Sequence, residues 1–550
     1  MQHNTLIDYL NHWARTQPDR IWLRQFRGDS CVDYSWSDAR TEITDVAAAL
    51  EHRFGNGANM LLLSANCAHW VLSDLAIIAS GNITVPLFTT HTADTAGYIA
   101  EFTGAKVIFV GHTENWAQVR PVLSDDTLII SLPGVEMEEA DLTWQQLVDE
   151  GRDKTCVYQC EADDVISLVF TSGTTGKPKG VIQTHRSNLT PIVRGQQYLN
   201  LGDYPRYFSY LPLSHLAERQ LVEFTSLCEG GEVFFNESKE TLITDLQRAK
   251  PHFFFGAPRV WEQLQHAVID KFGGIEKFDS TFNAMPKDVG ALIVEGLGLN
   301  DVKFCLTGSA PTPVSLTEWW QKIGIQLMDG FGQTEAMTLI VNTPEDCRLG
   351  SVGKPLGEVE CKLSDEGELL IKAQGLTPGY YQQPEKTAEL LQDGWLHTGD
   401  KARIDEDGFV FITGRVKDYF KTIQGKFVSP VPIESEFSKN ALVEQRCLLG
   451  RGLSKTVMVL VLTDAALDQD KLDVEDSIAQ TVEQVNATTD KHARIGAVII
   501  CKDGWTINNE FLTPTLKVRR EMVQDAYGDT AEQLARRSAE QKSLLIHWCC

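Results

Sequence analysis

Short apolar runs alternate with longer helical patterns over about the first 360 residues, and this alternation constrains the fold most strongly. The helical segments WSDARTEITDVAAALEHRF and HWVLSDLAIIASG each run into a short apolar stretch, NMLLLSA and TVPLF. Strands that alternate with helices favour parallel pairing, because each helix carries the chain back across the sheet. We therefore expect an α/β fold.

The alternation continues from residue 165, with turn-rich loops after several apolar runs. The further strand candidates are VISLVF, RYFSYLP, EVFF, HFFFG, VKFCLTG and IQLMDG. In open α/β sheets, ligands bind beyond the carboxyl ends of the strands. The loops that follow these runs are therefore the place where a binding site is expected.

The pattern changes twice toward the C-terminal end. Between residues 360 and 415, D-G and E-G pairs flanked by alternating apolar residues predict short antiparallel hairpins. Beyond Lys417 a mixed pattern returns, with TVMVLVLTD and AVIICKD as strands. Because 550 residues are too many for one compact core, we predict a domain at 1–414, a hinge at 415–418 and a domain at 419–550.

The formal net charge of −25 excludes one class of function. A protein that binds nucleic acid needs a basic surface, so we expect no nucleic-acid partner. No apolar run approaches the roughly 20 residues that span a bilayer, and no signal-peptide core is visible. The twelve cysteines are scattered, as in a reduced protein. We expect a cytoplasmic protein, with weak peripheral association at the inner membrane face left open.

One loop has a composition suited to phosphates. It is TSGTTGKPKG (171–180), between the strand candidate VISLVF and a segment with helical spacing, so we expect a strand, a loop and a helix in that order. Its glycines free backbone N–H groups to turn toward one point, while hydroxyls and lysines add donors and charge. A Walker loop is excluded, because Pro178 stands where that motif needs glycine. The alternative is an ordinary surface turn.

Three further loops carry candidates: LPLSHLAER (211–219), TGSAPTP (307–313) and DGFGQTE (329–335). We interpret the last as a glycine-rich turn that lets a ligand press on the backbone. Glu335 beside a phosphate site requires a hard cation between them, and Mg²⁺ favours one or two carboxylates with phosphate oxygens. The alternative is a solvated glutamate that begins a helix. Asp400 and Arg415 carry little meaning alone.

Six motifs together resemble the adenylate-forming enzymes, the superfamily of acyl-CoA synthetases, luciferases and peptide-synthetase adenylation domains. In the family's order they are TSGTTGKPKGV (171–181), DGFGQTE (329–335), GELLIKAQGLTPGYY (367–381), DGWLHTGD (393–400), GRVKDYFK (414–421) and LTPTLK (512–517). The resemblance implies a large N-terminal α/β domain with two related sheets and a small β unit, then a small mobile α+β lid domain. It also implies ATP, Mg²⁺ and coenzyme A.

The resemblance assigns the nucleotide site residue by residue. The loop from Thr171 to Lys179 would cradle the β- and γ-phosphates, and Glu335 with Thr171 would hold Mg²⁺. The full nucleotide-binding set comprises Thr171, Ser172, Gly173, Thr174, Thr175, Gly176, Lys179, Gly308, Asp329, Gly330, Phe331, Gly332, Thr334, Asp400 and Arg415.

Within that set, the resemblance gives five residues specific contacts. Phe331 and the Gly332 backbone would flank adenine, Thr334 would meet the α-phosphate, and Asp400 with Arg415 would bind ribose hydroxyls. Members of the family more often have tyrosine in place of Phe331, and the lost hydroxyl leaves stacking intact.

Catalysis is assigned to Lys517, with Glu335 and Thr171. The ammonium would stabilise charge that develops on phosphoryl oxygens and pyrophosphate; the alternative is a basic helix face that continues to Arg519 and Arg520. Lys417 matches the hinge position around which the lid turns. The turn would bring the 419–430 segment to the site, with Gly425 lining the tunnel for coenzyme A, although the segment reads Ile-Gln-Gly-Lys where Ser-Gly-Gly-Glu is common.

The acid is the least legible part of the sequence. YLPLSHLAER, HFFFGAPRVWEQL and LTPTLKVRR are most similar to long-chain fatty acyl-CoA synthetases, which implies an acyl pocket at His215, Phe255 and Gly256. The triple phenylalanine is alternatively a strand buried on both sides, and His215 alternatively caps a helix.

We therefore predict an ATP-dependent ligase that joins a medium- or long-chain fatty acid to coenzyme A through an acyl-AMP. One alternative is an adenylating enzyme with another acid or a carrier-protein acceptor. The other is a homologue that binds a nucleotide or an acyl group without catalysis. The sequence leaves the oligomeric state open, with a homodimer as one option.

Overall fold

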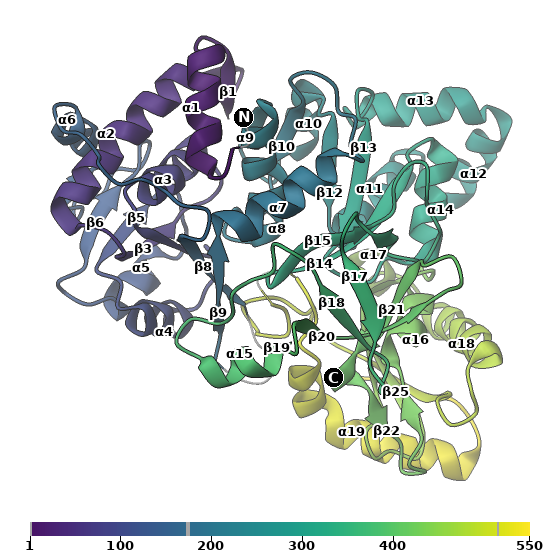
Figure 1. Cartoon of the computed structure of the whole chain (residues 1–550). Coiled ribbons are helices and arrows are strands. Elements are labelled where there is room, and N and C mark those ends of the chain that lie inside the picture. Colours follow the sequence, from purple (N-terminus) through teal and green to yellow (C-terminus); the bar gives the residue numbers. More distant parts are fainter. Residues whose placement is uncertain (1–2, 172–176, 514–515, 550) are drawn as a thin grey trace.

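The computed structural model describes residues 3–171, 177–513 and 516–549, and two large sheets lie side by side in its N-terminal part (Figure 1). The first sheet has seven strands in the order β7-β6-β5-β3-β4-β8-β9, parallel except for the β8–β9 hairpin. Its strands are β3 (Asn59–Leu63), β4 (Ile83–Leu87), β5 (Val107–Val110), β6 (Leu128–Ser131), β7 (Leu142–Thr143), β8 (Val165–Thr171) and β9 (Lys179–Thr184).

The second sheet has nine strands in the order β16-β15-β14-β13-β12-β10-β11-β1-β2, with antiparallel pairs at both edges. Its strands are β1 (Ile21–Arg27), β2 (Ser30–Ser35), β10 (Arg206–Ser209), β11 (Glu232–Phe235), β12 (Phe253–Gly256), β13 (Phe304–Gly308), β14 (Leu327–Gln333), β15 (Ala336–Val341) and β16 (Lys354–Pro355). The predicted α/β class and its two sheets are confirmed.

Helices cover these sheets, and several of them begin at a capping side chain. In α2, Ser35 and Asp38 form a reciprocal capping box, which satisfies free N–H groups of the first turn. The helices are α1 (Leu6–Thr16), α2 (Trp36–Phe54), α3 (Ala68–Ala79), α4 (Ala93–Thr103), α5 (Trp116–Val119), α6 (Trp144–Gly151), α7 (His185–Gln196), α8 (Leu216–Glu218), α9 (Thr225–Glu229), α10 (Leu242–Ala249), α11 (Pro258–Lys271), α12 (Ile275–Ala284), α13 (Pro286–Gly296), α14 (Val314–Ile323) and α15 (Pro384–Leu390). A π-helical turn, Arg219–Phe224, joins α8 to α9.

Two local predictions were wrong. The phosphate-type loop does not lead from a strand straight into a helix, because residues 179–184 form β9 and pair antiparallel with β8 before α7 begins. The segment DGFGQTE is not a turn, since its first five residues complete β14 and only Thr334 and Glu335 connect it to β15. In both cases a strand contains glycines that we had interpreted as turn residues.

A small antiparallel sheet follows, as predicted for residues 360–415. It contains β17 (Glu360–Leu363), β18 (Glu368–Lys372), β19 (Leu391–Gln392), β20 (Trp395–Ile404) and β21 (Val410–Arg415). A short 3-10 turn at Val416–Asp418 leads to the C-terminal elements. The predicted boundary at 414 and hinge at 415–418 coincide with this turn and stay predictions.

The C-terminal part is a smaller unit with its own core (Figure 1). Its central sheet has the order β24-β25-β26-β27, and β22 and β23 form a separate hairpin. The elements are β22 (Phe420–Lys421), β23 (Phe427–Val428), α16 (Pro430–Phe437), β24 (Val443–Leu449), β25 (Thr456–Leu462), α17 (Asp464–Leu467), α18 (Lys471–Thr488), β26 (Ile495–Ile500), α19 (Arg520–Gln541) and β27 (Leu545–Trp548).

A buried ion pair ties the two large sheets together behind the candidate loops. Arg219 Nε lies 3.0 Å from Asp74 Oδ2 on α3, and its Nη1 donates to Ser167 Oγ of β8 at 2.7 Å. Both charged side chains are 1% exposed or less. Glu223 lies beside them, and burial together with the Asp74 carboxylate raises its pKa well above the usual range, against the effect of Arg219. The direction of this shift favours the neutral, protonated form of Glu223.

Removing the charged partner of Arg219 should destabilise the N-terminal part. Asp74→Ala leaves an uncompensated buried guanidinium, and we expect a loss of about 3 kcal/mol in the free energy of unfolding. Glu223→Gln keeps the shape of the neutral form that the raised pKa favours, and it should cost less than about 1 kcal/mol. Urea unfolding followed by circular dichroism measures both. An equal loss in the two variants would show that Glu223 carries a charge.

Candidate active site

The hairpin β8–β9 brings the predicted phosphate loop to the edge of the seven-stranded sheet. Thr171 and Lys179 face each other as its last described pair, while Ser172, Gly173, Thr174, Thr175 and Gly176 lie outside the described residues. Lys179 Nζ lies 4.6 Å from the centre of the Tyr380 ring. Burial lowers the pKa of Lys179, and the nearby Lys386 and Lys417 act in the same direction against Glu335.

Glu335 is held at this edge by the segment 377–381. Its Oε1 accepts a hydrogen bond of 2.8 Å from the Tyr380 hydroxyl, and its backbone carbonyl accepts one of 3.0 Å from the Thr377 N–H. The same segment pairs with β9, because Tyr381 N–H donates to Gly180 and Ile182 N–H donates to Gly379. The phosphate-type hairpin and the predicted metal ligand are thus joined through one strand-like segment.

Asp400 and Arg415 face each other on β20 and β21. Arg415 Nε lies 2.9 Å from Asp400 Oδ1, and Gln333 Nε2 donates to Asp400 Oδ2 at 2.5 Å. Burial raises the pKa of Asp400, whereas Arg415 and Gln333 act in the opposite direction. Because Gln333 ends β14, this carboxylate joins the nine-stranded sheet to the small sheet.

Lys517 arrives at the same place from the C-terminal part. It keeps solvent access, but the surrounding protein desolvates its ammonium and lowers its pKa to about 8. Arg415 repels the ammonium as well, while Asp400 and Glu335 attract it. The structure therefore brings Lys517 near Asp400 and Glu335, each of which precedes it by more than a hundred residues in the chain.

The cluster has the charge that a polyphosphate requires. Lys179, Arg415, Lys417 and Lys517 lie within electrostatic reach of Glu335 or of one another, although the chain as a whole carries −25. An anion bound here would offset part of the repulsion that, after burial, lowers the pKa values of Lys179 and Lys517. Glu335 accepts a hydrogen bond but no arginine among the described ion pairs, so it fits a carboxylate ligand for Mg²⁺ beside phosphate oxygens.

His215 lies near this cluster. Burial lowers its pKa to about 3, and Lys517 contributes to the shift, so the imidazole is neutral at physiological pH. Its ring centre is 6.5 Å from that of Phe88. The helix-cap alternative is wrong for the side chain, because His215 precedes α8 without a capping hydrogen bond. Glu218 supports the loop, since its Oε1 accepts the Tyr210 N–H at 3.0 Å.

The remaining predicted positions shape the sheet edge. All four residues of β12 are buried, which confirms the alternative interpretation of the triple phenylalanine as a core strand. A Cβ on Gly256 would lie 2.9 Å from Trp261 Nε1, and one on Gly308 would lie 2.7 Å from the Gly330 carbonyl oxygen. Burial raises the pKa of Asp329 to about 8. The acyl-pocket role of Phe255 and Gly256 stays a prediction.

The residues predicted to contact adenine and the thiol lie in two different parts of the structure. Phe331 packs against the core of the small sheet, and the Thr334 carbonyl accepts a 2.8 Å hydrogen bond from Gln183 Nε2. Gly425, by contrast, sits at the exposed tip of the β22–β23 hairpin, with open space around it. A Cβ added at Gly425 would have no atom within 4 Å, so this position has no close contact with the cluster.

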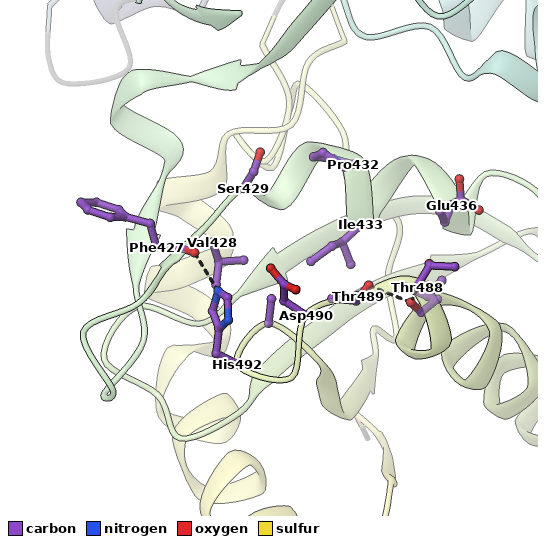
Figure 2. A pocket seen from close by; sticks show the side chains of 12 residues that line it. Phe427, Val428, Ser429, Pro432, Ile433, Glu436, Thr488, Thr489, Asp490 and His492 are labelled. Carbon is purple, nitrogen blue, oxygen red and sulfur yellow. Dashed lines mark hydrogen bonds between the residues drawn. The ribbon is translucent and has the colours of Figure 1, made fainter. Parts of the chain in front are cut away.

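Two hollows lie near these elements, and neither coincides with the cluster. A cavity of about 350 Å³ lies in the C-terminal part, and His492 Nε2 is 3.0 Å from the Phe427 carbonyl oxygen beside it. Figure 2 shows the side chains that line it, with His492 pointing toward that carbonyl. Phe427, Val428 and Ser429 of the predicted 419–430 segment line the cavity, whereas the cluster residues Glu335, Asp400, Arg415 and Lys517 do not. A more open hollow of about 500 Å³ is lined by Tyr380 and Thr387 and thus borders Glu335. The convergence of charges, and not cavity size, locates the candidate site.

Sequence reasoning missed three residues that orient the charged groups. Tyr380 holds Glu335, Gln333 holds Asp400, and Gln183 contacts the backbone at Thr334. Tyr380 and Gln333 fall inside motifs that we had singled out, so the sequence indicated that they lie at the site but not which side chains they hold. Gln183 had no signal, because β9 was not predicted.

This geometry defines a two-part nucleotide-binding enzyme whose C-terminal part contributes a lysine to the site. The family model described as AMP-binding enzyme matches residues 10–381, and that described as AMP-binding enzyme C-terminal domain matches residues 417–538. The chain therefore belongs to the AMP-binding enzyme family. Among the described residues, no helix has the length and apolarity to cross a membrane.

Curated relatives resemble the chain over most of its length. "Fatty acyl-CoA synthetase A" of Dictyostelium discoideum is 28% identical, with 90% of this chain and 85% of that protein covered. "Long-chain-fatty-acid–CoA ligase FadD15" of Mycobacterium bovis is 25% identical, with 97% of both covered. The adenylation domain of a carboxylate reductase from Mycobacterium chelonae has the same fold, with a TM-score of 0.82 at 21% identity and coverage of 96% and 91%.

The lowered pKa of Lys517 predicts how the first chemical step depends on pH. The ammonium is charged below about pH 8, so kcat/KM for ATP–pyrophosphate exchange should fall as the pH rises through 8, since this parameter reports the free enzyme. Lys517→Arg stays charged and should be less active but flat across the same range. A fall at the same pH in both proteins would assign the titration to another group.

Proposed function

We propose that the protein is an ATP-dependent ligase that joins a medium- or long-chain fatty acid to coenzyme A through an acyl-AMP intermediate. The observation that carries the proposal is the position of Lys517, which reaches Arg415, Asp400 and Glu335 from another domain. The names of the relatives in Dictyostelium and Mycobacterium support a fatty acid as substrate. We place the enzyme in the cytoplasm and leave peripheral contact with the inner membrane face open.

In the first step, a carboxylate oxygen of the fatty acid attacks the α-phosphorus of ATP. A new P–O bond forms, the bond to pyrophosphate breaks, and negative charge grows on the leaving group. Lys517 and Lys179 stabilise that charge as fixed cations, without exchanging a proton. Asp400 and Arg415 hold the ribose, and Phe331 stacks on adenine.

Glu335 with Thr171 would hold Mg²⁺ beside the phosphates, and the ion would neutralise part of their charge. The Tyr380 hydroxyl fixes the carboxylate in place through its 2.8 Å hydrogen bond. This contact keeps Glu335 from turning toward Lys179 or Lys517, each of which it attracts.

In the second step, the thiol of coenzyme A attacks the acyl carbonyl. A thioester bond forms, the bond to AMP breaks, and the thiol proton leaves to AMP or solvent. The C-terminal domain turns about Lys417 between the steps, which moves Lys517 away and brings the β22–β23 hairpin with Gly425 to the site. The exposed tip of that hairpin supports this proposal, because it leaves Gly425 available.

The choice of acid can be tested directly. ATP–pyrophosphate exchange over a panel of acetate, aryl acids and fatty acids of increasing length should peak with medium- or long-chain fatty acids, and added coenzyme A should yield the thioester. Carrier-protein acceptors serve as the comparison for the second step. Absence of exchange with every acid would contradict the ligase proposal.

Lys517→Ala separates the two steps. We expect exchange to fall by about 100-fold or more, since one preorganised cation is lost from the transition state. Thioester formation from supplied acyl-AMP and coenzyme A should stay within about threefold of the wild type, because Lys517 has left the site by then. Lys502→Ala is a matched loss of an exposed lysine in the same domain. An equal loss in both steps would contradict the two-step use of the domain.

A further inference from the structure

Four charged side chains face one another where the C-terminal part meets the N-terminal part. Arg259 and Glu262 lie on α11, and Glu444 and Arg446 lie on β24. Arg259 Nη2 pairs with Glu444 Oε1, and its Nη1 donates to the Glu444 carbonyl at 3.3 Å. Arg446 Nη2 lies 3.7 Å from Glu262 Oε1. We call these four side chains the interdomain clasp.

Local structure places each charge opposite its complement. Arg259 and Glu262 are three positions apart on one helical face, with Nη1 and Oε2 separated by 3.8 Å. Glu444 is an inserted residue in β24, because Val443 pairs with Leu462 and Gln445 pairs with Val461. A bulge of this kind re-aims a side chain. Arg259 of the helix thus faces Glu444 of the strand, and Glu262 of the helix faces Arg446.

The clasp lies in a half-buried setting, where salt screens charges less than on an open surface. The side chains of Glu262 and Arg446 are 15% and 19% exposed, and those of Arg259 and Glu444 are 28% and 36% exposed. Burial lowers the pKa of Arg446, while Glu262 and Glu434 counteract the shift and Arg259 adds to it. Reversal of one charge would therefore set two like charges against each other at short range.

A rigid connection links the clasp to Lys517. Arg520, three residues after Lys517, donates from Nη1 to the Leu448 carbonyl at 2.7 Å and pairs with Glu434 at 2.8 Å. Leu448 lies two residues from Arg446 on β24. The strand that carries the clasp and the segment that carries Lys517 therefore move together. Any rotation that withdraws Lys517 from Asp400 and Glu335 also pulls β24 away from α11.

We propose that the interdomain clasp positions the C-terminal domain for acyl-AMP formation and separates before the thioester step. The proposal rests on the two-step ligase activity proposed above. Its members are positioning residues, because they act through the placement of Lys517. A clasp present in only one of the two domain orientations should affect only the step carried out in that orientation.

The test reverses one charge and then restores the pair. Glu444→Arg should lower kcat/KM for ATP–pyrophosphate exchange about tenfold, because Arg259 would face a second cation. Thioester formation from supplied acyl-AMP and coenzyme A should stay within about threefold of the wild type. The double variant R259E/E444R should recover exchange to within about threefold, as expected for a direct pair. Glu436→Arg makes the same charge change at a residue whose ion pair among the described residues, with Lys439, lies within the domain, and it should leave both steps unchanged.

Equal losses in the two steps, unchanged exchange in Glu444→Arg, or no recovery in the double variant would overturn the proposal. Amide hydrogen exchange gives a readout without substrate. Residues 258–262, 443–449 and 415–419 should exchange faster in Glu444→Arg than in the wild type or Glu436→Arg, and identical exchange would also overturn the proposal. If the wild type activates no acid, the ligase proposal fails, while hydrogen exchange still decides whether the clasp holds the domains.

Discussion

The pair formed by Asp400 and Arg415 is the contact on which the candidate site depends. It closes the last two strands before the C-terminal part, and Gln333 ties it to the end of β14 in the large sheet. Its carboxylate attracts Lys517, whereas its guanidinium repels the same ammonium. The pair therefore sets both the position of the small sheet and the electrostatic field that the C-terminal lysine meets.

That field explains why the site needs parts of the chain that are far apart. Several cations gathered on one strand edge would repel one another and destabilise the fold without an anion. Here Lys179 and Arg415 belong to different sheets, and Lys517 belongs to the C-terminal part. A bound phosphate would offset the repulsion between these cations. Without phosphate, the carboxylates of Glu335 and Asp400 reduce that repulsion.

Much of this arrangement could be predicted from the sequence, because the spacing of apolar residues and the turn-forming residues between them determine local structure. The apolar runs NMLLL and FFFG became buried strands, and the D-G pairs became hairpins of the small sheet. The motifs placed Glu335, Asp400, Arg415 and Lys517 in one site before any geometry was known. Glycine misled the interpretation twice, since β9 and β14 use glycine for close strand contact where a turn seemed the simpler explanation.

The remaining features of the fold and the site could not be predicted, because they depend on contacts between elements that no local sequence pattern links. Arg219 reads as a surface residue, yet it is buried against Asp74, 145 positions away. Tyr380 meets Glu335 only because residues 377–381 pair with β9.

The interdomain clasp on α11 and β24 could not be predicted from the sequence either, because it joins two distant elements. Its charged composition suits the role that we propose for it. In the proposed cycle, a contact between the two domains must be strong enough to hold Lys517 at the site and weak enough to separate before the second step. Half-buried charge pairs meet both requirements, since they are directional and exchange their partners for water at modest cost, whereas an apolar contact of similar area would resist separation.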